Sequence, residues 1–336
     1  WRYIIRRINM KLDKKYLIIG AGALTLLLLL VILSTVGSVN LKLNEIISAL
    51  INNDNKMVTT IVYKMRLPRN ILAAIVGANL AVSGILLQSV MKNPLADPGI
   101  TGVSTGASVA AIIILLLLPQ YTAILPLIAF IGGSLACILV FIMAYKNGIK
   151  PGRIVLAGVA VNSILGGVIS FLSTMYSDRI QSAMLWLNGS LATKTWSHVE
   201  MLFAYSIIGL IISLFLIRSA NILQLGDDAA TNLGINVTFT RIVICSVAVF
   251  LVAISTSVVG VISFVGLIVP HIARMIMGSD HKYTIPFSIV LGSIVLLVAD
   301  TLGRTIGGPI EIPVGVIMSI FGGPFFLYLL RKREYE

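Results

Sequence analysis

The chain has 336 residues, of which 57% are hydrophobic and 11% are charged, and its mean hydropathy is +1.00. Because soluble globular domains carry about 25% charged residues, this composition excludes a soluble globular protein. The formal net charge of +12 is compatible with nucleic-acid binding, but Lys and Arg also accumulate in the cytoplasmic loops of membrane proteins. The positions of the basic residues along the chain decide between these two interpretations.

The chain starts with a basic segment, residues 1–15, which is followed by an apolar run at residues 16–36. That run is too long for the core of a signal peptide, so it predicts a retained transmembrane helix. The later apolar blocks are continuous rather than alternating, which favours spanning helices over strands. The predicted helices are residues 16–36, 69–91, 102–118, 122–145, 153–173, 200–217, 240–257, 260–277, 284–303 and 313–330.

These helices predict an all-α, polytopic fold with about ten spans, in which residues 1–336 form one transmembrane domain. With the amino terminus inside, 17 of the 25 Lys and Arg fall on the inner side and 8 on the outer side. Positive residues favour the cytoplasmic side. Both termini are therefore predicted to be cytoplasmic, and the basic charge needs no nucleic acid to explain it.

Two predicted outer connections, residues 37–68 and 174–199, are longer than a turn. The second contains Trp186 and Trp196, which at a membrane edge indicate interfacial anchors and leave room for a short amphipathic helix. Cys137 and Cys245 both lie inside apolar runs, where a packing role is favoured over a disulfide or a metal pair. No metal site is predicted.

The predicted helix at residues 69–91 carries a narrow stripe of small residues. Its members are Ala73, Gly77, Ala81, Gly84 and, at its end, the amide Gln88. Offsets of three and four residues place them on one helical face. Because small side chains let two backbones approach closely, the stripe predicts a tight contact with another helix.

Residues 218–241 form the main polar stretch on the predicted inner side. Within it, Gly226 suits a turn, Asp227 and Asp228 suit the positive amino end of a short helix, and Gly234 suits its carboxyl end. The pattern indicates a contact surface, although a solvated loop explains the same residues.

Six motifs occur in order along nearly the whole chain. They are RLPR at 66–69, GANLAVSG at 77–84, NPLADPGITGVSTGA at 93–107, LGDDAATNLG at 225–234, VISFVGLIVPHIAR at 261–274 and EIPVGVI at 311–317. Together they resemble the permease subunit of binding-protein-dependent ABC importers for iron-siderophores, haem and vitamin B12. The resemblance implies a cell-membrane complex of two permease subunits, two ATPase subunits and an extracytoplasmic binding protein, which in a Gram-positive cell would be a lipoprotein.

The resemblance implies that the chain itself is no enzyme and binds no cofactor, since ATP and Mg would sit on the partner ATPase subunits. In agreement, the sequence has no GxxxxGK[ST] phosphate loop. A ferric siderophore is the cargo favoured by the family's usual substrates, with haem and cobalamin as alternatives. Whether the second permease subunit is identical or merely similar is left open.

The resemblance also implies roles for three groups of residues. Outer arginines Arg66, Arg69 and Arg304 would receive carboxylates of the binding protein through their planar forks, although Asp300 and Arg304 also form an ordinary helical pair. The predicted coupling residues for the ATPase are Leu225, Gly226, Asp227, Asp228, Ala229, Ala230, Leu233 and Gly234. The candidate pathway residues, which helix packing explains equally well, are Asn162, Ser163, Gly166, Gly167, Ser170 and Ser173.

Two other function classes compete with an importer permease. An intramembrane enzyme is disfavoured because the sequence shows no GxSxG or HExxH motif and no paired intramembrane aspartates. A secondary transporter driven by an ion gradient fits the composition better, but it usually needs buried ionisable residues to couple ions. The predicted helix interiors are nearly free of such residues.

Overall fold

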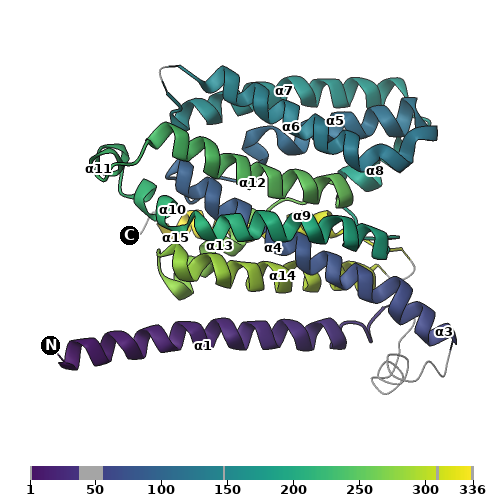
Figure 1. The fold of residues 1–336 in the computed structure, drawn as a ribbon. Coiled ribbons are helices and arrows are strands. Elements are labelled where there is room, and N and C mark those ends of the chain that lie inside the picture. The colour runs from purple at the N-terminus through teal and green to yellow at the C-terminus, as the bar shows by residue number, and fades with distance from the viewer. Residues whose placement is uncertain (1, 38–55, 147, 308–309, 334–336) are drawn as a thin grey trace.

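The computed structural model describes residues 2–37, 56–146, 148–307 and 310–333 (Figure 1). The helices of the first half are α1 (Arg2–Ile32), α3 (Lys56–Thr59), α4 (Leu67–Met91), α5 (Val103–Ile112), α6 (Leu125–Ala144) and α7 (Pro151–Met175). Those of the second half are α8 (Ile180–Leu187), α9 (Trp196–Phe215), α10 (Ile217–Gln224), α11 (Asp227–Asn232), α12 (Val237–Val259), α13 (Val265–Met277), α14 (His281–Ile306) and α15 (Val314–Arg333).

Short stretches of other helix types extend these elements. A π-helix at Thr60–Arg66 joins α3 to α4, and another at Ile113–Leu117 continues α5. Turns of 3-10 helix at Pro98–Thr101 and Pro119–Ile124 precede α5 and α6. Most of the predicted connection 37–68 and the side chains of the basic residues up to 13 lie outside the described residues.

Among the described residues, seven helices are long and apolar enough to cross a membrane, and three shorter apolar helices accompany them. The total agrees with the ten predicted spans. The connection 174–199, where the sequence left a short amphipathic helix open, contains α8. These elements confirm the all-α, polytopic fold.

Two predicted helix starts were wrong: the helix expected from residue 16 already begins at Arg2, and the helix expected from residue 260 begins only at Val265. Gly260 has a φ of +80°, and a Cβ there would lie 2.0 Å from the carbonyl oxygen of Trp186. The segment between α12 and α13 instead runs beside the loop after α8, where the Ser190 amide donates to the Val259 carbonyl at 2.8 Å. A helix through Gly260 would lose this contact.

Helix α4 forms the centre of the bundle. Of its 25 residues 22 are buried, and it packs against α9, α12, α13 and α14. Pro68 is the second residue of α4, where the preceding π-helix changes to α-helix. In Figure 1, α5 to α8 lie on one side of this central group and α1 lies on the other.

The small-residue stripe of α4 confirms the predicted close contact and extends it to two helices. A Cβ on Gly77 would lie 2.1 Å from the carbonyl oxygen of Gly292 on α14, and one on Gly84 would lie 1.9 Å from that of Gly266 on α13. At the end of the stripe, the Gln88 side-chain amide donates to the Gly266 carbonyl at 3.1 Å. Backbones of three helices therefore touch without intervening side chains.

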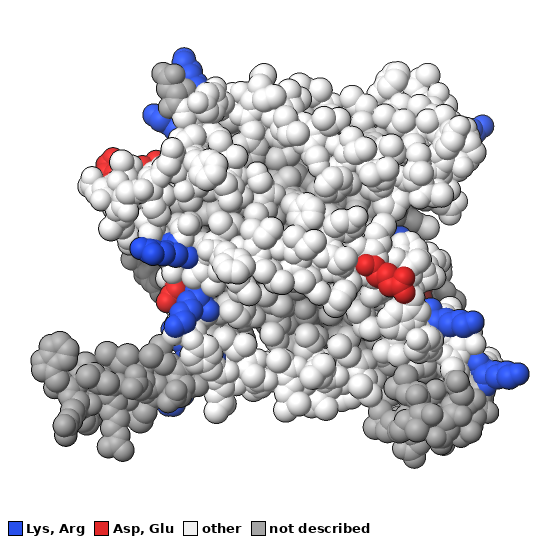
Figure 2. Space-filling view, viewed as in Figure 1, with Lys and Arg blue, Asp and Glu red and all other residues white. Residues whose placement is uncertain are grey.

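The described ends of the chain and α11 lie at one end of the bundle, which we call the α11 end (Figure 1). Helices α3 and α8 lie at the opposite end, called the α3 end. On the face shown in Figure 2, charged side chains gather toward these two ends and the band between them is almost free of charge. This distribution suits a bundle whose middle lies in hydrocarbon.

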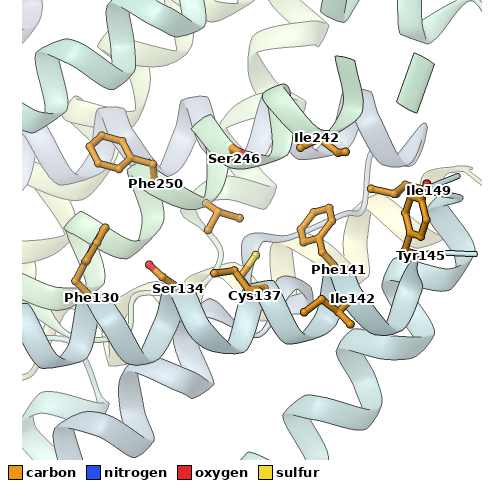
Figure 3. Close-up of a pocket in the computed structure, with 12 residues that line it drawn as sticks. Phe130, Ser134, Cys137, Phe141, Ile142, Tyr145, Ile149, Ile242, Ser246 and Phe250 are labelled. Atoms are coloured by element: carbon orange, nitrogen blue, oxygen red, sulfur yellow. The ribbon is translucent and has the colours of Figure 1, made fainter. Parts of the chain in front are cut away.

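A cavity of about 470 Å³ opens between α6 and α12 (Figure 3). Phe130, Phe141 and Phe250 line it together with Cys137, and none of its described lining residues is charged. Its polar groups are the hydroxyls of Ser134, Tyr145 and Ser246, so the described lining has no charge with which to attract an ion. Cys137 and Cys245 are free and buried, which confirms their predicted packing role.

Candidate functional site

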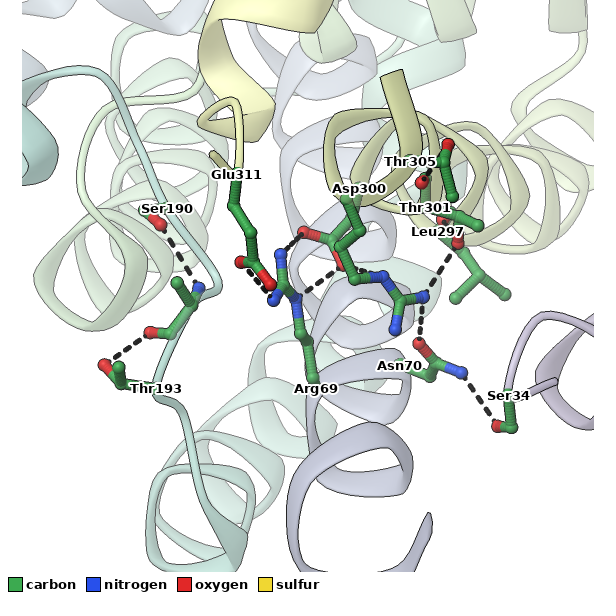
Figure 4. A network of polar contacts seen from close by, with 12 residues as sticks. Ser34, Arg69, Asn70, Ser190, Thr193, Leu297, Asp300, Thr301, Thr305 and Glu311 are labelled. Atoms are coloured by element: carbon green, nitrogen blue, oxygen red, sulfur yellow. Dashed lines mark hydrogen bonds and ion pairs between the residues drawn. The ribbon is translucent and has the colours of Figure 1, made fainter. Parts of the chain in front are cut away.

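The α3 end carries a cluster built around Arg69, the third residue of α4 (Figure 4). Its guanidinium donates to both oxygens of Asp300 on α14, at 2.8 and 3.0 Å, and to Glu311 at 2.7 Å. The Asp300 side chain is 1% exposed and that of Glu311 is 45% exposed. Arg69 is thus held by one buried carboxylate and by a second that reaches solvent.

The same cluster contains the other two predicted arginines. Arg304 donates to the side chains of Asn70 and Thr301, both at 2.9 Å, and lies 3.6 Å from Asp300. The helical pair that the sequence offers for Arg304 is therefore present, although Asp300 makes its shorter contacts with Arg69. Arg66 donates to the Ser34 and Thr35 carbonyls, at 2.7 and 3.1 Å, where α1 has just ended.

The structure thus brings Arg66, Arg69 and Arg304 together at one end, all three less than a tenth exposed. Sequence reasoning missed Glu311 as a partner of Arg69, although it opens the quoted motif EIPVGVI. Beside the cluster lies a cavity of about 370 Å³ lined by Arg69, Trp186, Lys194 and Glu311 among others. Burial there holds the pKa of Lys194 below its usual range.

At the α11 end, the short helix predicted from the glycine and aspartate pattern is present. Helix α11 runs from Asp227 to Asn232, with Gly226 before it at a φ of +116° and Gly234 after it at +79°. Both glycines have a positive φ, which glycine adopts more readily than other residues. Leu225 and Leu233 flank the helix with exposures of 66% and 60%, and Asp228 is also exposed.

Two coupling residues have a different environment from the one predicted. Ala230 was expected to face a partner protein but is fully buried within the chain, so that expectation was wrong. Asp227 was expected to meet basic groups of a partner. Instead, one of its oxygens accepts from both Lys92, which follows α4, and Arg241 of α12.

The contacts of Asp227 also set its protonation. Burial favours the neutral acid, but the hydrogen bonds and charges of Lys92 and Arg241 outweigh it and hold the pKa of Asp227 below its usual range. A carboxyl group whose folded-state pKa is lowered stabilises the fold above its ordinary pKa of about 3.9 and loses that contribution as the pH falls through the lowered value. Asp227 is therefore ionised, and its contacts persist, throughout the physiological range.

The candidate pathway residues all lie on α7, which leaves much of its surface open. A Cβ on Gly166 or Gly167 would meet no atom within 4 Å, and Ser163 and Ser170 are exposed. Ser173 is half-buried and bonds to the backbone of its own helix. For these residues the small, mildly polar face is unoccupied within the described chain.

Asn162 is engaged within the chain. Its side-chain amide donates to the Gly99 carbonyl at 2.9 Å, and its oxygen accepts from Thr105. Gly99 belongs to the 3-10 turn at Pro98–Thr101, which Asp97 caps by accepting from the Gly99 amide at 2.8 Å. Asn162 thus anchors α7 to the turn before α5.

Comparison with known proteins relates this architecture to membrane transport. Residues 24–332 match the model of the FecCD transport family. The Fe(3+)-citrate import system permease protein YfmE of Bacillus subtilis is 35% identical, over 97% of this chain and 98% of that protein. The probable heme-iron transport system permease protein IsdF of Staphylococcus aureus is 38% identical, over 89% of this chain and 90% of that protein.

Solved structures give the same relationship. An inward-facing conformation of a putative metal-chelate type ABC transporter superposes with a TM-score of 0.84 and 27% identity, covering 94% of this chain and 99% of the other. PsaBC from Streptococcus pneumoniae shares the fold alone, with a TM-score of 0.56 and 18% identity over 85% of this chain and 95% of that one. The chain therefore belongs to the FecCD transport family and is a multi-pass permease of an ABC transporter in the plasma membrane.

Proposed function

We propose that this chain forms the transmembrane pathway of an ATP-driven importer for an iron chelate. The similarity to permeases named for Fe(3+)-citrate and heme-iron transport, over nearly the whole chain, is the observation that carries the proposal. Among iron chelates, ferric citrate, haem and a ferric siderophore are the cargoes to test. Cobalamin is the further candidate that the sequence motifs suggest.

We place the α11 end in the cytoplasm. The inner side then holds 17 of the 25 Lys and Arg, in agreement with the positive-inside rule, and both termini lie there with α11. The α3 end, with its arginine cluster, then faces outward. In this orientation the polar residues of α11 face a cytoplasmic partner, and the arginine cluster faces an extracytoplasmic one.

At the inner end, α11 is the proposed contact with one of the two ATPase subunits, which bind ATP and Mg. Exposed Leu225 and Leu233 offer apolar area on either side of α11, and exposed Asp228 offers a charge to basic groups of the ATPase. Ala229 is partly exposed and completes this surface. Apolar anchors surrounded by polar groups are the usual composition of an interface core.

At the outer end, we propose that the arginine cluster receives carboxylates of an extracytoplasmic binding protein. Arg66, Arg69 and Arg304 carry three positive charges against Asp300 and Glu311, so the cluster has a net charge of 3 − 2 = +1. Glu311 is the replaceable partner because its side chain is 45% exposed. A carboxylate of the binding protein, attracted by this net charge, would take the position of Glu311 on Arg69.

The open face of α7 is the proposed wall of the pathway, completed by the same face of a second permease subunit. Ser163, Gly166, Gly167 and Ser170 offer a small, mildly polar surface on which a bulky chelate finds no deep site. Asn162 is removed from this wall by its contacts with Gly99 and Thr105. The second subunit is either an identical chain or a similar one.

Reconstituted uptake tests this function. Vesicles containing the permease, an ATPase subunit and a binding protein encoded beside it should accumulate one of ⁵⁵Fe-citrate, haem or a ⁵⁵Fe-siderophore only when ATP is enclosed with the ATPase. Uptake driven by a proton or sodium gradient without ATP would replace the proposal with secondary transport. ATP-dependent uptake of cobalamin alone would change the cargo and keep the mechanism.

A further inference from the structure

The amino end of α11 is fastened to the bundle through a single carboxylate oxygen. Oδ1 of Asp227 accepts from Nζ of Lys92 and, at 2.7 Å, from Arg241. Helix α11 has only six residues, too few to be stable as an isolated helix. Its position must therefore come from its contacts with the rest of the chain, and Asp227 supplies the charged ones.

The contacts of Arg241 extend from α11 to the turn before α7. Arg241 is 2% exposed, and its second terminal nitrogen donates to the Ile149 carbonyl at 2.9 Å. Ile149 is bridged to Tyr145 across the turn between α6 and α7, and Pro151 begins α7 two residues later. One buried guanidinium thus joins α11 to the turn that leads into the candidate pathway helix, α7.

The contact of Lys92 with Asp227 connects α11 to the end of the central helix, α4. Lys92 follows the last residue of α4 in the left-handed conformation, with a φ of +49°, and its amide closes the helix on the Gln88 and Ser89 carbonyls. This fixed backbone sets where its side chain begins. A displacement of Asp227 therefore acts on two elements that are far apart in sequence: the end of α4 through Lys92, and the start of α7 through Arg241.

We propose that Asp227 is a positioning residue that transmits the movement of α11 to α7 through Arg241, with Lys92 holding the same carboxylate to the end of α4. The inference rests on the proposed function, because it requires an ATPase that moves α11. An ordinary surface ion pair contributes little. Here the pair includes a buried guanidinium, whose other acceptor within the described chain is the Ile149 carbonyl.

Asp227→Asn tests this role, since it keeps the shape of the side chain and removes its charge. In the reconstituted complex of permease, ATPase and binding protein, we expect the uptake per ATP hydrolysed to fall about 5-fold or more. A factor of about 5 corresponds to the lower end of typical coupling free energies between two sites of a protein. Asp227→Glu, which restores the carboxylate, should recover most of that ratio. All values are normalised to complexes that retain the ATPase after purification, so poor folding does not enter the comparison.

Two further variants provide matched comparisons. Asp178→Asn removes a carboxylate from an exposed Asp–Arg pair, 3.3 Å apart, in the connection between α7 and α8, and should leave the ratio unchanged. Asp228→Asn removes the same charge from the exposed side of α11 and should lower ATPase retention more than the ratio. If Asp227→Asn and Asp178→Asn give the same ratio, the inference is overturned while the proposed function stands. If the unaltered complex shows no ATP-dependent uptake, the proposed function itself fails.

Discussion

Arg69 is neutralised from two directions that differ in their exposure to water. Asp300 is buried and accepts two hydrogen bonds, whereas Glu311 accepts one at the surface. A planar guanidinium suits this arrangement because its fork binds one carboxylate bidentately and still has donors for another. The inner partner fixes the position of Arg69, and the outer partner is free to exchange.

Replacing Arg69 by alanine should destabilise the permease by about 3 kcal/mol, because it leaves the buried Asp300 carboxylate with only the more distant Arg304. The midpoint of thermal unfolding in detergent should fall accordingly. Adding Asp300→Asn to Arg69→Ala should cost less than the sum of the two single changes, since the charge left unpaired is then also removed. Strict additivity would show that the two side chains do not depend on each other.

Arg179→Ala provides the control for this prediction. Arg179 and Asp178 also form an ion pair, but their side chains are 62% and 71% exposed. Water solvates either charge when its partner is removed, so the change should stay within about 0.5 kcal/mol. A loss as large as that of Arg69→Ala would mean that burial does not distinguish the two pairs.

The sequence identified the arginines, the helical pair of Arg304 with Asp300 and the short helix of the polar segment, but not the partners of Arg69 and Asp227. Arg69 and Asp300 are separated by 231 residues, and no local spacing relates them. Likewise, the aspartates near Gly226 indicate a helix start, but only the folded chain brings Lys92 and Arg241 to Asp227. Spacing and capping patterns in the sequence predicted the local helices. The ion pairs join residues that are distant in sequence, so they become visible only when the helices are packed together.

At the scale of elements, the close packing of α4 depends on the absence of side-chain atoms at a few positions. Without a strong hydrophobic drive between helices in lipid, close contact of backbones supplies much of the attraction. Gly77 and Gly84 permit that contact with two different helices, as the Cβ positions above demonstrate. The stripe was visible in the sequence because it follows helical spacing.

Gly84→Ala should force α4 and α13 apart, because the added methyl would lie 1.9 Å from the Gly266 carbonyl oxygen. Overpacking of this kind costs about 1 to 3 kcal/mol, to be measured as a lower unfolding midpoint. Gly20→Ala on α1 is the matched substitution, since no atom lies within 4 Å of the new Cβ. It should be neutral or stabilise by up to about 1 kcal/mol through helix propensity, and equal losses would contradict the packing argument.

The misplaced start of α13 illustrates the limit of hydrophobic pattern at this scale. Residues 260–264 are as apolar as the helix that follows, so composition alone continues the helix through them. Gly260 was the available signal, because an isolated glycine between two apolar runs marks a break as readily as a packing contact. The tertiary contact with the loop after α8 decides between the two.

At the scale of the whole molecule, the proposed orientation puts α11 and Asp178 on opposite sides of the membrane. Single cysteines can test it, since the two native cysteines are buried. In cells that lack the ATPase subunit, which would cover Leu233, Asp178→Cys should react with a membrane-impermeant maleimide in intact cells, whereas Leu233→Cys should react only after permeabilisation. The reverse pattern would invert the orientation and exchange the proposed partners of the two ends.

The backbone contacts of α4 with α13 and α14 also divide the bundle mechanically. Helices that touch without side chains between them cannot slide past one another without a steric clash, so these three should behave as a stationary frame during the transport cycle. The open face of α7 has no such restraint at Gly166 and Gly167. Its first half is held, because a Cβ on Gly158 would lie 1.9 Å from the Ile100 carbonyl oxygen and Asn162 donates to the Gly99 carbonyl. Any rocking of α7 against the frame would therefore pivot near the turn before α5 and displace the second half of α7 most.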